Sequence, residues 1–391
     1  MKKLSLIVMS LSHMFIDIYN NVLPVLLPLF VLQFSLSYTQ VGLVVALFSI
    51  SSSLVQPIFG FISDRWRTNW FLPGGILGVS ILASLLGLAP NYSFLMVAIG
   101  LMGISSAIFH PRGLTSASLA SGERRGLGVS IFTLGGNIGF ALGPILAAFV
   151  VLHWGLRGTV FLLIPGIIIT ALTFYLRRHF YLVPQRELRT EKEHPFSQLP
   201  LSEFLVLCSL VTLRAWAVQG IVAFLPLYLQ NREVPLHMAG NLLSAFLFSG
   251  AVAGLLGGYL SDILGRKAVM SSSLFLFTPL MFLFLQSTGK LSMVFLILAG
   301  TMLLTSAPLS FVMAHEMMPS NIGLASGLIM GLAFGMGGLG VGVTGMIADR
   351  LGLGFSMTIL SLLPLLAALM TFLLKERRAT LAPANPIPRS D

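Results

Sequence analysis

The feature that most constrains this chain is a succession of apolar stretches, each long enough to cross a lipid bilayer as a helix. About 20 helical residues span the ~30 Å hydrocarbon core of a bilayer. Only 9% of the residues are charged, whereas soluble domains carry about 25%. We therefore predict an all-α integral membrane protein. Polar residues, prolines and glycines divide it into twelve predicted transmembrane helices, near residues 4–32, 39–62, 70–89, 92–120, 126–152, 157–177, 201–230, 237–261, 268–288, 291–317, 321–348 and 353–374.

The N-terminus places Lys2 and Lys3 before an apolar run, as a signal peptide does. No small-residue cleavage site follows, and the run contains His13 and Asp17. We therefore expect this segment to be the first membrane helix. Cys208 is the single cysteine, so the fold does not depend on an intrachain disulfide.

One long polar stretch, from Arg177 to Pro200, separates six predicted helices from six. This division predicts two pseudo-symmetric six-helix bundles. We expect the N-terminal bundle over residues 1–180, a cytoplasmic linker over 181–200, the C-terminal bundle over 201–378 and a cytoplasmic tail over 379–391.

The distribution of positive charge predicts the orientation of the helices. An even number of spans puts both termini on one side of the membrane. Of the 23 Lys and Arg residues, seventeen fall on that side and four on the other, while Arg112 and Arg214 lie inside helices. By the positive-inside rule both termini are cytoplasmic, and we expect the inner membrane of a bacterium. Because this bias also explains the net charge of +10, we expect no nucleic-acid partner.

The two predicted halves repeat each other at an offset of 198 residues. Matched prolines, glycines and aspartates are more informative than matched leucines, because they reflect backbone and charge requirements. Such matches pair Pro28 with Pro226, Gly60 with Gly258, and Asp64 with Asp262. Two parallel six-helix repeats are typical of transporters that bind substrate at the repeat interface, near the middle of the membrane.

The ends of the second and eighth predicted helices carry related motifs. Residues 60–67 read GFISDRWR, and residues 258–267 read GYLSDILGRK. A glycine allows close helix packing, and an aspartate at a helix C-terminus needs a basic partner. Both stretches resemble the GxxxDRxGR[RK] loop motif of the major facilitator superfamily. The first lacks the Gly-Arg portion, and the second has Ile263 in place of the first arginine. A third, partial match to this motif, from Gly345 to Asp349-Arg350, follows the eleventh predicted helix.

Further stretches narrow this resemblance. Residues 135–144, GGNIGFALGP, are similar to the antiporter motif of that superfamily, and a small-residue packing face would use the same glycines. The chain also resembles the fosmidomycin-resistance branch of exporters in Ser12-His13 with Asp17, in Phe109-His110-Pro111 and in residues 323–340. The resemblance implies the major facilitator fold and drug export. It departs at Arg112-Gly113, where an acidic residue is usual, and this departure bears on the substrate rather than on the fold.

The first predicted helix carries a polar stripe. His13 and Asp17 are four residues apart, and Asn20 and Asn21 continue the same face. An ionisable residue at membrane depth costs about 2.5–3.5 kcal/mol on insertion scales and usually faces a cavity. We predict that Asp17 and His13 couple transport to protons and that Asn20 and Asn21 contact substrate. A helix-packing hydrogen-bond network is the alternative role of this stripe.

The fourth and seventh predicted helices add polar residues at membrane depth. His110 and Arg112 flank Pro111, which frees a backbone carbonyl one turn earlier. Arg214 lies too deep in the seventh helix to reach the membrane surface easily, and Gln219 is nearby. We predict substrate contacts for all four polar residues. The alternative for Arg112 is that its side chain reaches the cytoplasmic interface.

The motif residues near the cytoplasmic surface predict a gate. We expect Asp64 and Asp262 to pair with cations or helix ends across the two halves when the protein is open outward. The predicted gating residues are Asp64, Arg65, Asp262, Arg266 and Glu316. For Glu316 and its neighbour His315, an ordinary helix-end contact is equally expected.

We predict a monomeric, proton-coupled antiporter that exports a small molecule. No nucleotide-binding loop, zinc constellation or nucleophile triad occurs in the sequence, so we expect neither an enzyme nor a cofactor. The alternatives are ion-driven uptake of an organic anion, and a membrane sensor or enzyme on a transporter body. Asp17 can neutralise only one of the two membrane-depth arginines, so the other is expected to bind an anionic substrate such as a carboxylate or phosphonate.

Overall fold

The computed structural model describes residues 3–66, 70–122, 124–177, 200–319 and 322–375. Within these ranges the regular structure is helical, and twelve spans are long and apolar enough to cross a membrane, which confirms the predicted number. The elements are α1 (Lys3–Asn20), α2 (Leu23–Phe34), α3 (Tyr38–Ser49), η1 (Ile50–Leu54), α4 (Gln56–Trp66), α5 (Phe71–Leu85), η2 (Leu86–Leu88), α6 (Tyr92–Ala120), α7 (Arg125–Trp154), η3 (Leu156–Leu162), α8 (Leu163–Leu176), α9 (Leu201–Gln230), α10 (Leu236–Leu264), α11 (Arg266–Gln286), α12 (Gly289–Met317), α13 (Ile322–Leu351), α14 (Leu353–Met370) and η7 (Thr371–Leu373).

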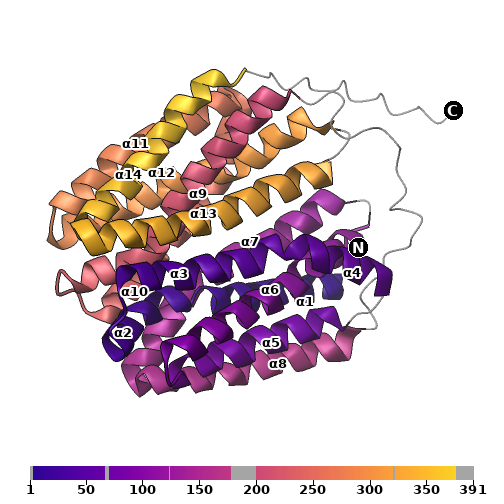
Figure 1. Cartoon of the computed structure of the whole chain (residues 1–391). Coiled ribbons are helices and arrows are strands. Elements are labelled where there is room, and N and C mark those ends of the chain that lie inside the picture. The colour runs from indigo at the N-terminus through magenta and orange to yellow at the C-terminus, as the bar shows by residue number, and fades with distance from the viewer. Residues whose placement is uncertain (1–2, 67–69, 123, 178–199, 320–321, 376–391) are drawn as a thin grey trace.

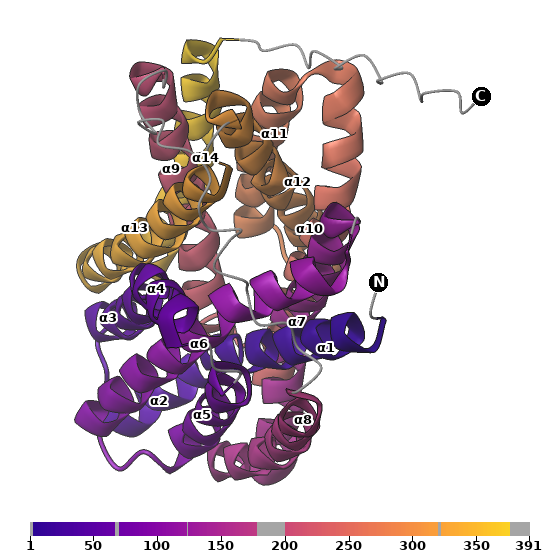
Figure 2. The same cartoon turned by 90° about the vertical axis from the view of Figure 1, so that its right-hand side faces the viewer.

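The helices form two groups (Figures 1 and 2). In Figure 1, α1 to α8 lie in the lower part of the molecule, and α9 to α14 lie mainly above them. Because consecutive spans alternate in direction, the start of α1 and the end of α14 lie on one side, here called the terminus side. The opposite side, where α3 begins and α13 ends, is called the far side. The predicted linker and tail lie outside the described residues, apart from Pro200.

Two of the spans are interrupted. The first breaks between Asn20 and Leu23, just before Pro24, whose ring nitrogen cannot donate to the preceding turn. The second span contains the π-helical turn η1 between α3 and α4, and the Gln56 side chain donates to the Ser52 carbonyl at 2.8 Å. Single π-helical turns are frequent at functional sites, and nothing in the sequence predicted this one.

The glycine-rich stretch of α7 is a packing face for α1. A Cβ atom added at Gly139 would lie 2.1 Å from the Met14 carbonyl oxygen, and one at Gly143 would lie 2.6 Å from that of Ile18. The backbones of α1 and α7 are therefore so close that only glycine fits at these two positions. This packing accounts for the stretch that resembles an antiporter motif, and it sets the position of the polar stripe on α1.

The two groups of helices meet along α3 with α13 and along α7 with α10. A Cβ atom added at Gly42 of α3 would lie 2.7 Å from the Val341 carbonyl oxygen of α13. At the second contact, a Cβ atom at Gly240 of α10 would lie 2.9 Å from the Pro144 carbonyl oxygen of α7. Glycines therefore allow close helix contacts between the two groups as well as within one of them.

Candidate functional site

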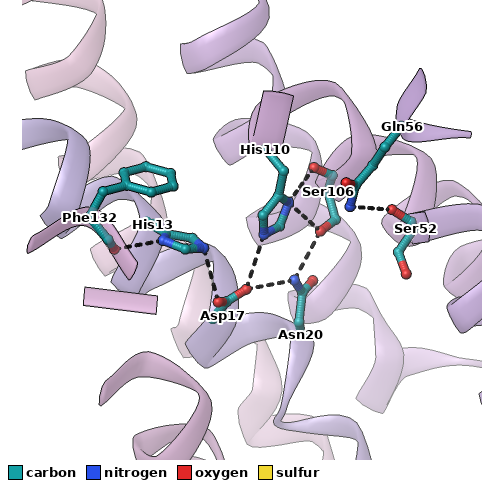
Figure 3. A network of polar contacts seen from close by, with 8 residues as sticks. All are labelled: His13, Asp17, Asn20, Ser52, Gln56, Ser106, His110 and Phe132. Carbon is teal, nitrogen blue, oxygen red and sulfur yellow. Dashed lines mark hydrogen bonds and ion pairs between the residues drawn. The ribbon is translucent and has the colours of Figure 1, made fainter. Parts of the chain in front are cut away.

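A cluster of three ionisable side chains joins α1 to α6 (Figure 3). His13 Nε2 lies 3.2 Å from Asp17 Oδ2, and His110 Nε2 lies 3.4 Å from Asp17 Oδ1. The two imidazole rings are 5.1 Å apart and nearly perpendicular. The two histidines thus contact the same carboxylate, each through a different oxygen. Sequence spacing predicted the pair of His13 and Asp17, but only the fold adds His110 to it.

The position of His13 depends on its neighbours on α7. Its ring stacks on Phe132 with centroids 4.1 Å apart, and its Nδ1 lies 2.8 Å from the Phe132 carbonyl oxygen. A Cβ atom added at Gly136 would lie only 2.3 Å from the ring. The ring is therefore held between an aromatic side chain, a backbone carbonyl and a glycine that leaves room for it.

The hydrogen bonds of the two histidines determine which ring nitrogen carries a proton. His13 Nδ1 faces the Phe132 carbonyl, and His110 Nδ1 faces the Ser106 carbonyl at 2.8 Å. A carbonyl oxygen only accepts, so each Nδ1 must be the protonated nitrogen of a neutral ring. Each Nε2 would then present a lone pair to Asp17. A carboxylate also presents lone pairs, so each contact with Asp17 requires a proton between the two atoms.

The cluster therefore has two positions for an exchangeable proton. With both occupied, one carboxylate and two imidazolium rings give the cluster a net charge of +1. Loss of one proton makes the cluster neutral, and one of the two contacts then becomes unfavourable because two lone pairs face each other. The arrangement can bind or release a proton and can convert that event into the gain or loss of a contact between α1 and α6.

Asn20 extends the cluster along α1. Its Nδ2 donates to Asp17 Oδ1 at 3.2 Å and to Ser106 Oγ at 2.9 Å. Its Oδ1 is buried and accepts no hydrogen bond from the described residues. A buried acceptor without a partner is unfavourable by about 1–3 kcal/mol, so this atom is suited to a donor group on a bound molecule.

The same three side chains could also act as metal ligands, since one ligand atom from each lies within 4.8 Å of the others. A tetrahedral zinc ion with bonds of about 2.0–2.1 Å places its ligand atoms about 3.3 Å apart. The contacts of 3.2 and 3.4 Å to Asp17 match that separation and also have the lengths of long hydrogen bonds. The geometry of the cluster therefore suits either shared protons or a metal ion.

The two arginines at membrane depth have different surroundings from those expected. Neither forms an ion pair with Asp17, whose partners in the described part of the chain are the two histidines and Asn20. Arg112 is buried at 2% exposure on α6, two residues after His110. Arg214 is 7% exposed near the middle of α9, and its guanidinium has no hydrogen-bond or ion-pair partner among the described residues.

The described carboxylates do not offset the charge of Arg214. Asp17 faces the histidines, and Asp262 and Glu316 both pair with Arg266. Glu203 pairs with Lys375, and Glu233 is exposed in the turn after α9. Asp349 accepts from the N-terminus of α3. Arg214 is therefore a buried cation that the described acids leave unbalanced, and an uncompensated buried charge is costly.

The other predicted contact residues serve the packing of helices in this structure. Gln219 of α9 accepts from Ser49 of α3 at 2.7 Å and donates to the Phe334 carbonyl of α13 at 3.1 Å. It therefore bridges the two groups of helices. Asn21 is buried and donates to the Phe140 carbonyl of α7. Sequence reasoning missed Ser49, because one serine among several in that stretch carries no distinguishing signal.

The predicted gating residues of the C-terminal half lie together on the terminus side. Arg266 contacts Asp262 at 3.0 Å and Glu316 at 3.1 Å, which joins the ends of α10, α11 and α12. Among the described residues, these contacts join helices of one group. Asp64 and Arg65 lie on α4, but their side chains lie outside the described residues. His315 contacts Ser326 of α13 at 2.6 Å.

Comparison of the sequence with known proteins gives consistent matches. The sequence model of the Major Facilitator Superfamily matches residues 9–236 and 207–389. The fosmidomycin resistance protein of Escherichia coli (strain K12) is 31% identical over 373 residues, which cover 94% of this chain and 92% of that protein. The uncharacterized MFS-type transporter YfnC of Bacillus subtilis (strain 168) is 32% identical over 382 residues, with coverage of 95% and 93%.

Solved structures match the fold. A bacterial homolog of the human lysosomal transporter Spinster, in an inward-facing and occupied conformation, superposes with a TM-score of 0.80 at 15% identity, over 94% of this chain and 95% of that one. The xylose transporter XylE from E. coli, in an inward open conformation, gives 0.75 at 15% identity, with coverage of 96% and 97%. At this level of identity the likeness establishes the arrangement of the helices.

Proposed function

The chain belongs to the major facilitator superfamily of transporters, and from that premise we propose that it is a proton-coupled antiporter that exports a small molecule from the cytoplasm. The observation that carries the proposal is the convergence of His13 and His110 on Asp17. A membrane-depth carboxylate with two imidazole partners offers a place to load and unload protons. The similarity to a fosmidomycin resistance protein supports export of a drug-like compound.

In the proposed cycle, the cluster alternates between two proton loads. The doubly protonated cluster keeps both contacts to Asp17 and holds α1 against α6. Release of one proton breaks one contact and frees either His110 or His13. Asn20 donates both to Asp17 and to Ser106 of α6. A change in the Asp17 contacts therefore also moves the buried Oδ1 acceptor of Asn20. Substrate binding and proton binding thus compete for one group of side chains, as exchange requires.

The proposed substrate is an anion held by Arg214. This guanidinium is buried, has no partner among the described residues and can bind a carboxylate, phosphate or phosphonate through two parallel hydrogen bonds. Arg112 adds a second cation two residues beyond His110. Fosmidomycin, a phosphonate, is the first compound to test.

We further propose that the terminus side faces the cytoplasm and that its motif residues control switching. The order of the spans along the sequence assigns seventeen of the 23 Lys and Arg residues to that side, which supports this orientation by the positive-inside rule. There Arg266 holds Asp262 and Glu316 within the C-terminal group. In the opposite conformation Asp64 and Asp262 would meet cations or helix ends of the other half. Neutralising either should change the switching rate more than substrate affinity.

Transport into proteoliposomes tests the proposal directly. An antiporter accumulates substrate when the vesicle interior is acidic, because protons leave as substrate enters. A symporter accumulates it only when the exterior is acidic, which would identify the alternative of ion-driven anion uptake. The panel should contain anionic, neutral and cationic compounds. Accumulation that is independent of the pH gradient, or accumulation only of lipophilic cations, would contradict the proposed coupling or the proposed substrate class, respectively.

A further inference from the structure

A carboxylate of α13 binds the beginning of α3 on the far side of the protein. Asp349 Oδ1 accepts the backbone N–H of Tyr38 at 2.7 Å, and Oδ2 accepts the backbone N–H of Thr39 at 2.8 Å. Oδ2 also accepts the Thr39 hydroxyl at 2.5 Å. The two partners belong to different groups of helices, because α3 is in the N-terminal half and α13 is in the C-terminal half.

The contact completes the cap of α3. The first N–H groups of a helix lack intrahelical partners and carry the positive end of the helix dipole. Ser37 serves as the local cap, because its hydroxyl accepts from the Gln40 N–H and its own N–H donates to the Gln40 side chain. This capping box leaves the N–H groups of Tyr38 and Thr39 without acceptors. Asp349 supplies both from the other half of the protein.

The surrounding packing brings the same two helices together. A Cβ atom added at Gly345 would lie 2.2 Å from the Tyr38 carbonyl oxygen, so α13 touches the backbone of α3. One turn deeper, Val341 is fully buried against Gly42 of α3. Asn231, after α9, donates to the Tyr38 hydroxyl at 3.2 Å. The far-side ends of the two halves are therefore in direct contact.

The charge pairs on the terminus side are arranged differently. There Arg266 joins helices of the C-terminal half to one another. Beyond the π-helical turn η1, α4 packs on α6 of its own half, whereas α3 packs on α13 (Figure 2). The second span thus packs on the C-terminal half through α3 and on its own half through α4. Asp349 contacts α3, the part that packs on the C-terminal half.

We propose that Asp349 is a latch: its hydrogen bonds to α3 hold the far side of the transporter closed in this conformation, and they break when that side opens. The chemistry suits a reversible contact. Asp349 is exposed, so water can solvate both the carboxylate and the freed N–H groups after separation. The hydrogen bonds are charge-assisted and directed at a helix N-terminus, so they favour the closed state without making it permanent. The latch requires no particular coupling ion or direction of transport.

Cysteine labelling tests the latch without any substrate. In a Cys208→Ala background, Val341→Cys places a thiol that is buried at the far-side contact. The purified protein in lipid nanodiscs is treated with a water-soluble maleimide, which reacts only in molecules whose far side is open. Asp349→Ala should raise the labelling rate by a factor of about ten or more, because it removes all three hydrogen bonds and the loss of one charge-assisted bond alone corresponds to about tenfold. Asp349→Asn, which keeps one oxygen acceptor, should give a smaller rise.

Arg350→Ala is the matched control, because it removes a charge from the same helix end and no contact of Arg350 with α3 is observed among the described residues. It should label at the parent rate. Equal rates in the parent and both Asp349 variants would overturn the latch, and so would an equal rise in Arg350→Ala. If Asp349→Ala does not fold, Asp349→Asn decides alone. Because no proton gradient or substrate is used, failure here is separate from failure of the proposed antiport.

Discussion

His110 on α6 places its Nε2 atom 3.4 Å from Oδ1 of Asp17 on α1, while His13 contacts the other carboxylate oxygen, Oδ2. Its Nδ1 donates a hydrogen bond to the Ser106 carbonyl at 2.8 Å. The contact with Asp17 therefore exists only while a proton lies between the two groups. In the proposed antiport, proton binding at this carboxylate controls the contact between α1 and α6.

Asp17→Asn should abolish transport driven by a pH gradient while the protein still folds. Asparagine has nearly the same size, but it does not ionise and cannot exchange a proton with His13 or His110. We expect gradient-driven accumulation in proteoliposomes to fall to the level of empty vesicles. Thermal unfolding and elution in detergent should stay close to those of the parent. Full active transport by this variant would exclude Asp17 as the coupling residue.

His110→Gln should reduce the number of protons released when substrate binds. Glutamine can still donate to a neighbouring acceptor, but it removes one of the two exchangeable positions. The measurement is proton release from detergent-solubilised protein in weak buffer, followed with a pH-sensitive dye as fosmidomycin is added. His153→Gln is the control, because His153 is exposed and its ring contacts the Phe149 carbonyl far from the cluster. The same release in both variants would remove His110 from the proton site.

Gly136→Ala should lower stability and disturb the cluster, because the added methyl group would lie 2.3 Å from the His13 ring. Overpacking of this kind costs about 1–3 kcal/mol. Gly74→Ala in α5 is the control. A Cβ atom there meets nothing within 4 Å, and alanine is favoured over glycine inside a helix by about 0.5–1 kcal/mol. Thermal unfolding in detergent should therefore shift down for the first variant and not for the second.

Arg214→Gln should weaken the binding of anionic substrates at least roughly tenfold, as expected for the loss of a charge-assisted hydrogen bond. Arg214→Lys should recover only part of the affinity, because an ammonium lacks the planar fork of a guanidinium. The apo form of Arg214→Gln should unfold at a higher temperature than the parent, since a buried cation without a partner destabilises the protein. Isothermal titration and thermal unfolding measure the two effects. Unchanged affinity would refute the anion site.

Much of the architecture follows from the sequence alone. The boundaries of the twelve spans were predicted to within a few residues. The length of an apolar stretch and the polar residues that end it are local properties of the sequence, and they decide whether a helix can span a bilayer. The repeat and the resemblance to the major facilitator superfamily rested on matched glycines, prolines and aspartates. The spacing of His13 and Asp17 predicted a shared helix face, and the structure places them in contact.

Only the tertiary structure brought His110 to Asp17, left Arg214 without a partner among the described residues and set Asp349 on the N-terminus of α3. In each case the partners come from different helices. Their contact depends on which faces of α1, α6, α3 and α13 pack together, and glycines that allow close approach decide that packing. Helical periodicity determines which side chains share a face. It does not determine which other helix that face meets, and so the chemistry of the site is decided by the fold.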